Sequence, residues 1–160
     1  LIGAYLLPML NGGETFGMSP RDFLENPILW PTCLERYDAN FTIAPNFGYA
    51  LTCKRLEANN KTFNLANLIA CSGAEPCDTS VIPKVEKFLG IPKENMFGGY
   101  GLAEHGLMIT CGCATRPTLP GTNRWSMGSV AEAYTQDGIT IKIVHEGSVQ
   151  EDGSEGEIWV

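Results

Sequence analysis

The chain has 160 residues, 44% of them hydrophobic, which is enough to bury the core of one domain. Its formal net charge is −7, from 11 basic and 18 acidic residues. That balance argues against a general nucleic-acid binder, which needs a basic face. No apolar stretch is long enough to predict a membrane span. Six cysteines, some in apolar runs, lack the spacing of a zinc site. We therefore expect reduced thiols, no metal on Cys or His, and a cytoplasmic location.

The first forty residues predict short elements. An apolar run at 1–10 ends at Asn11-Gly12-Gly13, and residues 14–18 predict a short buried strand. Ser19 and Pro20 are typical of a helix start, because serine caps the first N–H groups and proline suits the first helical position.

The middle of the chain alternates strand and helix signals. Residues 41–44 predict a strand and residues 47–59 a helix. Residues 65–71 are apolar at nearly every position, which predicts a strand covered on both faces. An apolar helical stripe then runs from Val81 to Leu89 and ends at Gly90.

Strand signals dominate the remainder. Residues 95–97 predict a strand, residues 98–101 a glycine-rich loop, and residues 111–128 a long surface loop. Further strands are predicted at 139–144 and 157–160. This order predicts an α/β fold, with a parallel sheet flanked by helices and followed by a smaller β region.

Two glycine-bearing loops follow predicted strands, at 72–76 and 98–104. In an open parallel sheet, ligands bind beyond the carboxyl ends of the strands. Tyr100 stands between glycines and could stack on a base, and Glu104 offers a hard oxygen ligand suited to Mg²⁺. The residues alone leave two readings open: a nucleotide site, or two tight turns with Tyr100 packed and Glu104 solvated. The glycine spacing matches neither a Rossmann fingerprint nor a Walker loop.

Five segments, in order along the chain, resemble the adenylate-forming superfamily of acyl-CoA synthetases, nonribosomal adenylation domains and luciferases. Two of them, ACSGAEP (70–76) and GYGLAE (99–104), resemble its adenine-edge loop and its adenine-and-magnesium motif. MSPRDFLENPILW (18–30) and APNFGYAL (44–51) resemble fatty acyl-AMP ligases in particular, and DGSEGEIWV (152–160) is similar to a later strand of the superfamily. The resemblance implies a middle portion of such an enzyme.

The domains implied are a partial adenine- and acyl-binding subdomain (1–110), a loop-rich connector (111–138) and the start of a β subdomain (139–160). The resemblance places no catalytic residue here, since the phosphate loop and the catalytic lysine are expected outside these 160 residues. It assigns Mg²⁺ to Glu104. The resemblance implies nucleotide contacts at Gly73, Ala74, Glu75, Pro76, Gly99, Tyr100, Gly101 and Leu102. It implies acyl-pocket contacts at Asn46, Phe47 and Gly48. For Phe47, plain core packing stays open, and for Glu75 a turn or cap role does.

The function implied is part of a fatty acyl-AMP ligase. Such an enzyme joins a fatty acid to ATP, releases pyrophosphate and passes the acyl adenylate to a carrier-protein thiol. The implied cofactors are ATP and Mg²⁺, with CoA or phosphopantetheine as acceptor, and the implied partners are a fatty acid and an acyl carrier protein or CoA. We do not expect the 160 residues alone to be active.

Three alternatives stay open. Residues 105–138 are short for the insertion typical of these ligases, which keeps a long-chain acyl-CoA synthetase in view. The others are an inactive ligase-like module that binds lipid or adenylate, and a purely structural α/β domain.

Overall fold

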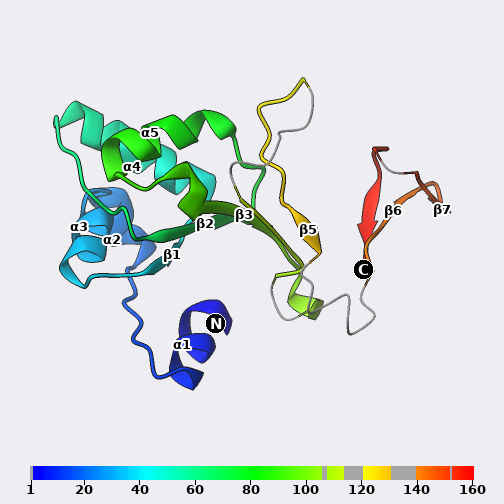
Figure 1. Cartoon of the computed structure of the whole chain (residues 1–160), viewed down its shortest axis with the longest axis horizontal. Coiled ribbons are helices and arrows are strands. Elements are labelled where there is room, and N and C mark those ends of the chain that lie inside the picture. Colours follow the sequence, from blue (N-terminus) through cyan, green and yellow to red (C-terminus); the bar gives the residue numbers. More distant parts are fainter. Residues whose placement is uncertain (1, 106–107, 114–120, 131–139, 152) are drawn as a thin grey trace. The chain divides into compact units, whose positions relative to one another are not determined.

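The computed structural model describes residues 2–105, 108–113, 121–130, 140–151 and 153–160. The chain divides into two compact units, Leu1–Gly128 and Ser129–Val160, which are coloured from blue to yellow and from yellow to red in Figure 1. Within the described ranges, no helix is both long and apolar enough to cross a membrane.

The first unit opens with short helices. A π-helical turn (Ile2–Leu6) leads into α1 (Leu7–Leu10), and α2 (Pro20–Glu25) and α3 (Leu29–Arg36) follow. The strand predicted at 14–18 is wrong: the segment is irregular and largely exposed. Its residues pair with no strand among those described, and a lone extended segment cannot satisfy its backbone groups except with water.

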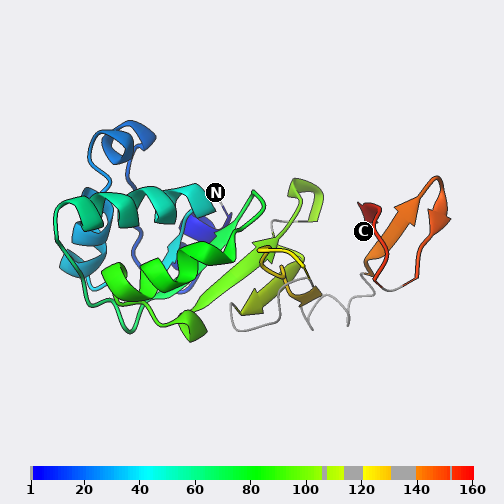
Figure 2. The same cartoon turned by 90° about the horizontal axis from the view of Figure 1, so that it is seen from above.

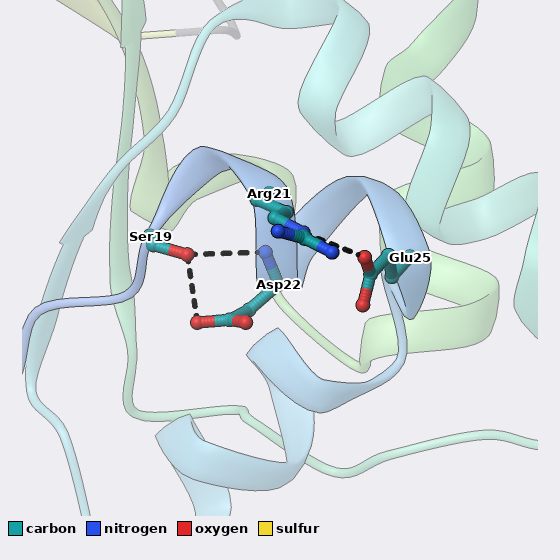
Figure 3. Close-up of polar contacts among 4 residues, drawn as sticks. All are labelled: Ser19, Arg21, Asp22 and Glu25. Atoms are coloured by element: carbon teal, nitrogen blue, oxygen red, sulfur yellow. Dashed lines mark hydrogen bonds and ion pairs between the residues drawn. The ribbon is translucent and has the colours of Figure 1, made fainter.

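The predicted start of α2 is confirmed (Figure 3). The Ser19 hydroxyl accepts a hydrogen bond from the Asp22 backbone N–H at 3.1 Å and donates one to the Asp22 carboxylate at 2.7 Å. Arg21 and Glu25, one turn apart, form an exposed ion pair at 2.9 Å. Serine at this position satisfies an N–H group that would otherwise have no partner inside the helix.

The main sheet of this unit has the strand order β1 (Phe41–Ile43), β2 (Ile69–Gly73), β3 (Met96–Tyr100) and β4 (Thr110–Cys113). The first three strands are parallel, and β4 runs antiparallel to β3. Helices α4 (Asn46–Ala58) and α5 (Ile82–Leu89) cross between the parallel strands and cover one face of the sheet (Figures 1 and 2). Single-turn 3₁₀ helices lie at Thr79–Val81, Lys93–Asn95 and Ala103–His105. The predicted α/β fold is confirmed.

The core lies between this sheet and the two helices. Its fully buried residues come from α4, α5, the strands and the connections between them: Tyr49, Leu56, Val85, Leu89, Ile91 and Met96. Helix α5 ends at Gly90, whose φ of 68° lies in the left-handed region that glycine adopts without steric cost.

The opposite face of the sheet is apolar and exposed at β1 and the start of β2. Phe41 and Ile69 are paired across β1 and β2 and are 43% and 45% exposed, and Ile43 is 50% exposed. The prediction that the strand at 65–71 is covered on both faces is therefore confirmed only in part: Ile69 is exposed, whereas Cys71, on the same face, is 7% exposed.

Two predicted boundaries also shift. The apolar run 65–68 forms a turn closed by the Leu68 N–H to the Leu65 carbonyl at 3.0 Å, and β2 begins only at Ile69. The glycines predicted as a loop at 98–101 instead continue β3 through Tyr100. An apolar sequence marks burial, and burial alone does not separate a strand from the turn that precedes it.

The predicted surface loop 111–128 is wrong in part. Its first residues belong to β4, and Trp125 is only 4% exposed. Residues 114–120 lie outside the described residues.

The second unit begins with β5 (Ser129–Val130) and contains a small antiparallel sheet of order β7–β6–β8. Its strands are β6 (Lys142–His145), β7 (Ser148–Val149) and β8 (Glu157–Trp159), which confirms the predicted β region. Glu146 and Gly147 join β6 to β7 with φ values of 49° and 79°, the geometry of a tight hairpin. Part of the strand predicted at 139–144 lies outside the described residues, and β6 starts at Lys142.

Candidate functional site

Three of the predicted segments gather at one edge of the sheet. The residues 46–48 follow β1, the residues 74–76 follow β2, and the residues 101–104 follow β3. Because β1, β2 and β3 are parallel neighbours, their carboxyl ends share this edge. It is the edge at which open α/β sheets bind ligands.

The ends of β2 and β3 approach very closely. Gly73 and Gly99 are paired in register, and a Cβ atom on Gly73 would lie 2.5 Å from the Gly99 carbonyl oxygen. Position 73 therefore requires glycine, because any side chain there would clash with the Gly99 backbone. Gly73, Gly99 and Tyr100 are each partly exposed at this edge.

The loop after β2 has a defined shape. Ala74 has a φ of 66°, an uncommon conformation for a residue with a Cβ. The buried Cys77 thiol lies 3.2 Å from the Ser72 hydroxyl and donates to the Glu75 carbonyl oxygen at 3.5 Å. These contacts close the loop on itself.

A segment that sequence reasoning did not assign to the site supports this loop from outside. The Trp125 backbone N–H donates to the Cys77 carbonyl at 3.0 Å, and the Thr79 backbone N–H donates to the Asn123 carbonyl at 2.9 Å. Asp78 and Arg124 also form a β-bridge. The one signal in the sequence was Trp125 itself, a large aromatic residue in a segment rich in Gly, Pro and Thr.

The first turn of α4 contacts the same loop. The Glu75 carboxylate accepts a hydrogen bond from the Phe47 backbone N–H at 2.8 Å, across 28 positions of sequence. Gly48 is buried, Phe47 is 52% exposed, and the Asn46 side-chain oxygen is buried with no hydrogen-bond partner among the described residues. The structure thus brings two predicted groups together, the acyl segment and the loop after β2.

Glu104 lies in the 3₁₀ turn Ala103–His105 and is exposed. Within the described part of the chain, its carboxylate forms no hydrogen bond or ion pair. The side chains of Tyr100 and Glu104 likewise make no hydrogen bond with the other two segments there. A free carboxylate fits Mg²⁺, which proteins commonly hold through one or two carboxylates together with substrate phosphates. The described residues contain no group of three or more metal-ligating side chains.

The buried thiols near the site are not nucleophiles at neutral pH. Burial raises the pKa of Cys71 to about 11, and it also raises the pKa of Cys77 above its ordinary value. Both stay protonated, and the reactive form of cysteine is the thiolate. Neither of these two thiols is therefore an activated cysteine.

Known proteins with similar sequences are adenylate-forming enzymes and ligases. The profile of the family described as AMP-binding enzyme matches residues 1–160. A medium-chain-fatty-acid–[acyl-carrier-protein] ligase, TtuA, of Teredinibacter turnerae is 32% identical over 117 residues, which are 70% of this chain and 18% of that protein.

Solved structures agree with this match. The fatty acid AMP ligase of Legionella pneumophila is similar with a TM-score of 0.79 and 26% identity, over 99% of this chain and 32% of that one. The L. pneumophila fatty acyl-adenylate ligase in complex with acyl adenylate and pyrophosphate has a TM-score of 0.72 and 28% identity, over 90% and 29%. The chain thus spans between about a fifth and a third of the length of these proteins. With its whole length matched by the family profile, the chain belongs to the AMP-binding enzyme family.

Proposed function

We propose that this chain is the adenine- and acyl-binding part of a fatty acyl-AMP ligase. The observation that carries the proposal is the convergence of three segments at the carboxyl ends of β1, β2 and β3. The names of the three similar proteins described above support it: each is a fatty acid or fatty acyl ligase, and one structure holds acyl adenylate and pyrophosphate.

In this proposal adenine lies against the paired ends of β2 and β3. The close approach of Gly73 to Gly99 leaves flat backbone there, and Tyr100 supplies a ring for stacking. The backbone of Ala74, Pro76, Gly101 and Leu102 completes the adenine edge.

The fatty acid carboxylate lies by Asn46, Phe47 and Gly48. The Asn46 side-chain amide offers an N–H donor to the carboxylate, which only accepts hydrogen bonds, whereas its oxygen is buried with no partner among the described residues and cannot bond the carboxylate. Phe47 is half exposed, which leaves its ring free to contact the first methylenes of the acyl chain.

The reaction joins a carboxylate oxygen of the fatty acid to the α-phosphorus of ATP and breaks the bond to pyrophosphate. Mg²⁺, when bound, neutralises charge on the phosphate oxygens. Glu104 would hold the ion, and the remaining residues of the site would position the two substrates, which supplies much of the rate in such transfers.

The acceptor in this proposal is the phosphopantetheine thiol of an acyl carrier protein. The similarity to a fatty-acid–[acyl-carrier-protein] ligase favours it over CoA. The alternative is transfer to CoA, as in an acyl-CoA synthetase, and the short segment 105–138 is the feature in its favour.

Fatty-acid-dependent exchange of labelled pyrophosphate into ATP tests the adenylation step in the full-length protein. Glu104→Ala should lower exchange at least a hundredfold and leave the unfolding temperature unchanged. Glu35→Ala, which also removes an exposed carboxylate, is the matched control and should exchange like wild type. Wild-type exchange in Glu104→Ala would show that the magnesium assignment is wrong. No exchange in the wild type would overturn the proposed activity.

A further inference from the structure

The first turn of α4 has no side-chain cap of its own. Its N-cap residue is Pro45, whose side chain has no hydrogen-bond acceptor, and no side-chain cap bond forms there. The Gly48 N–H is satisfied by the Pro45 carbonyl at 2.9 Å, and the Phe47 N–H is satisfied by Glu75 at 2.8 Å. The cap of this helix therefore comes from a loop 28 residues further along the chain.

The carboxylate is well suited to this position. The amino end of a helix carries partial positive charge, and a carboxylate forms stronger hydrogen bonds to backbone N–H groups than a neutral acceptor does. Within the loop, the Cys77 thiol donates a hydrogen bond to the Glu75 carbonyl, and the preceding residue, Ala74, has a φ of 66°.

The contact joins the two halves of the proposed site. Glu75 belongs to the loop assigned to adenine, and Phe47 lies between Asn46 and Gly48 in the segment assigned to the acyl group. Two more hydrogen bonds attach α4 and its lead-in to the middle of β2. The Ala44 N–H and the Tyr49 hydroxyl both donate to the Cys71 carbonyl, at 3.1 and 3.0 Å. In those two bonds the acceptor belongs to strand β2, whereas in the Glu75 bond the acceptor belongs to the loop that follows it.

We propose that Glu75 is a positioning residue that couples the nucleotide loop to the acyl-binding turn of α4. Its carboxylate is engaged with the Phe47 N–H, so the residue contributes to adenine binding through its backbone. A nucleotide that orders the loop then also orders the turn that receives the fatty acid, and the two substrates bind cooperatively. The proposal rests on the proposed function for its ligands, but the tether can be tested without them.

Amide hydrogen exchange in the full-length protein without substrates tests the tether. Glu75→Ala should speed exchange of the Phe47 amide about tenfold, because the N–H loses its acceptor. Glu75→Gln keeps an oxygen that can accept the bond and should stay within about threefold of wild type. Glu86→Ala is the matched control: Glu86 likewise accepts a backbone N–H, that of Lys93 at 3.1 Å, far from this turn in sequence. It should leave the Phe47 amide unchanged. An unchanged amide in Glu75→Ala would overturn the proposal.

Substrate coupling is measured by titrating the fatty acid with and without a non-hydrolysable ATP analogue. In the wild type the analogue should tighten fatty acid binding, and by linkage the fatty acid should tighten analogue binding equally. Glu75→Ala should lose at least three quarters of this factor, and Glu75→Gln should retain most of it. Weaker analogue binding with an intact coupling factor would identify Glu75 as a direct adenine contact and overturn the proposal. If the wild type binds neither ligand, the proposed function fails, while the exchange experiment still decides the tether.

Discussion

Replacing Gly73 with alanine should push apart the ends of β2 and β3. The new Cβ would lie 2.5 Å from the Gly99 carbonyl oxygen, whereas ordinary contacts begin at 3.4 Å, so the strands must separate by about 0.9 Å. The atom it meets belongs to backbone within a paired sheet, which cannot swing aside as a flexible side chain would. The φ of Gly73 is outside the left-handed region, so the effect is one of space alone.

Overpacking of this kind costs about 1–3 kcal/mol of unfolding free energy. A displacement near 1 Å at a binding edge can also cost about a hundredfold in rate. We therefore expect a lower urea midpoint and a value of kcat/KM for ATP reduced at least tenfold in pyrophosphate exchange. Gly17→Ala is the control, since among the described residues the Cβ there would meet only the Tyr5 hydroxyl, at 3.5 Å. Wild-type stability and kinetics in Gly73→Ala would refute the close-approach argument.

Three further predictions concern stacking, helix capping and pH. Tyr100→Ala should raise KM for ATP about tenfold by loss of base stacking, and Tyr100→Phe should restore it; an unchanged KM in the alanine variant would count against the adenine assignment. Ser19→Ala should lower the unfolding free energy by about 1 kcal/mol in urea titration, and Ser19→Asp should retain most of it; equal stability of all three proteins would refute the cap. Burial raises the pKa of Cys53 to about 12 and that of Cys71 to about 11, from an ordinary value of 9.0. The unfolded chain therefore releases these protons first, and stability should be fully present below pH 9 and fall as pH rises towards 11–12. Urea titrations at pH 8 and 10.5 measure the fall, and a smaller fall is expected in Cys71→Ala; an identical fall would contradict the thiol's part in it.

The helices were the most predictable elements. Helix α5 carries a clear apolar stripe and ends at a glycine in the conformation that glycine favours, so its pattern and its end agree. The start of α2 was equally plain, because Ser19 makes a local bond to a residue three positions away.

The strands at the site were harder to predict. Gly98 and Gly99 are typical of a loop, yet they lie in β3, where Cβ atoms would come 3.0 Å from the Met127 and Met108 sulfur atoms. Glycine at these positions lets the two methionine side chains pack closely against the strand, which no local pattern reports. The apolar run before β2 was misplaced because Leu65 and Leu68 are buried in a turn.

Within the site, sequence patterns located segments but not the contacts between them. The placement of three loops at one edge followed from the order of parallel strands, a rule of topology. The bond between Glu75 and the Phe47 N–H spans 28 positions and depends on the register of β1 and β2. The hydrogen bonds that join the residues 123–125 to the residues 77–79 likewise connect segments far apart in the sequence, which no local pattern predicts.

The most direct test of the account is a product analysis of the full-length protein incubated with a fatty acid, ATP and Mg²⁺, with and without CoA. Products are separated and identified by mass. We expect acyl adenylate in both reactions, persisting when CoA is added. Conversion to acyl-CoA would contradict the carrier-protein assignment, and the absence of any acyl adenylate would contradict the proposed activity.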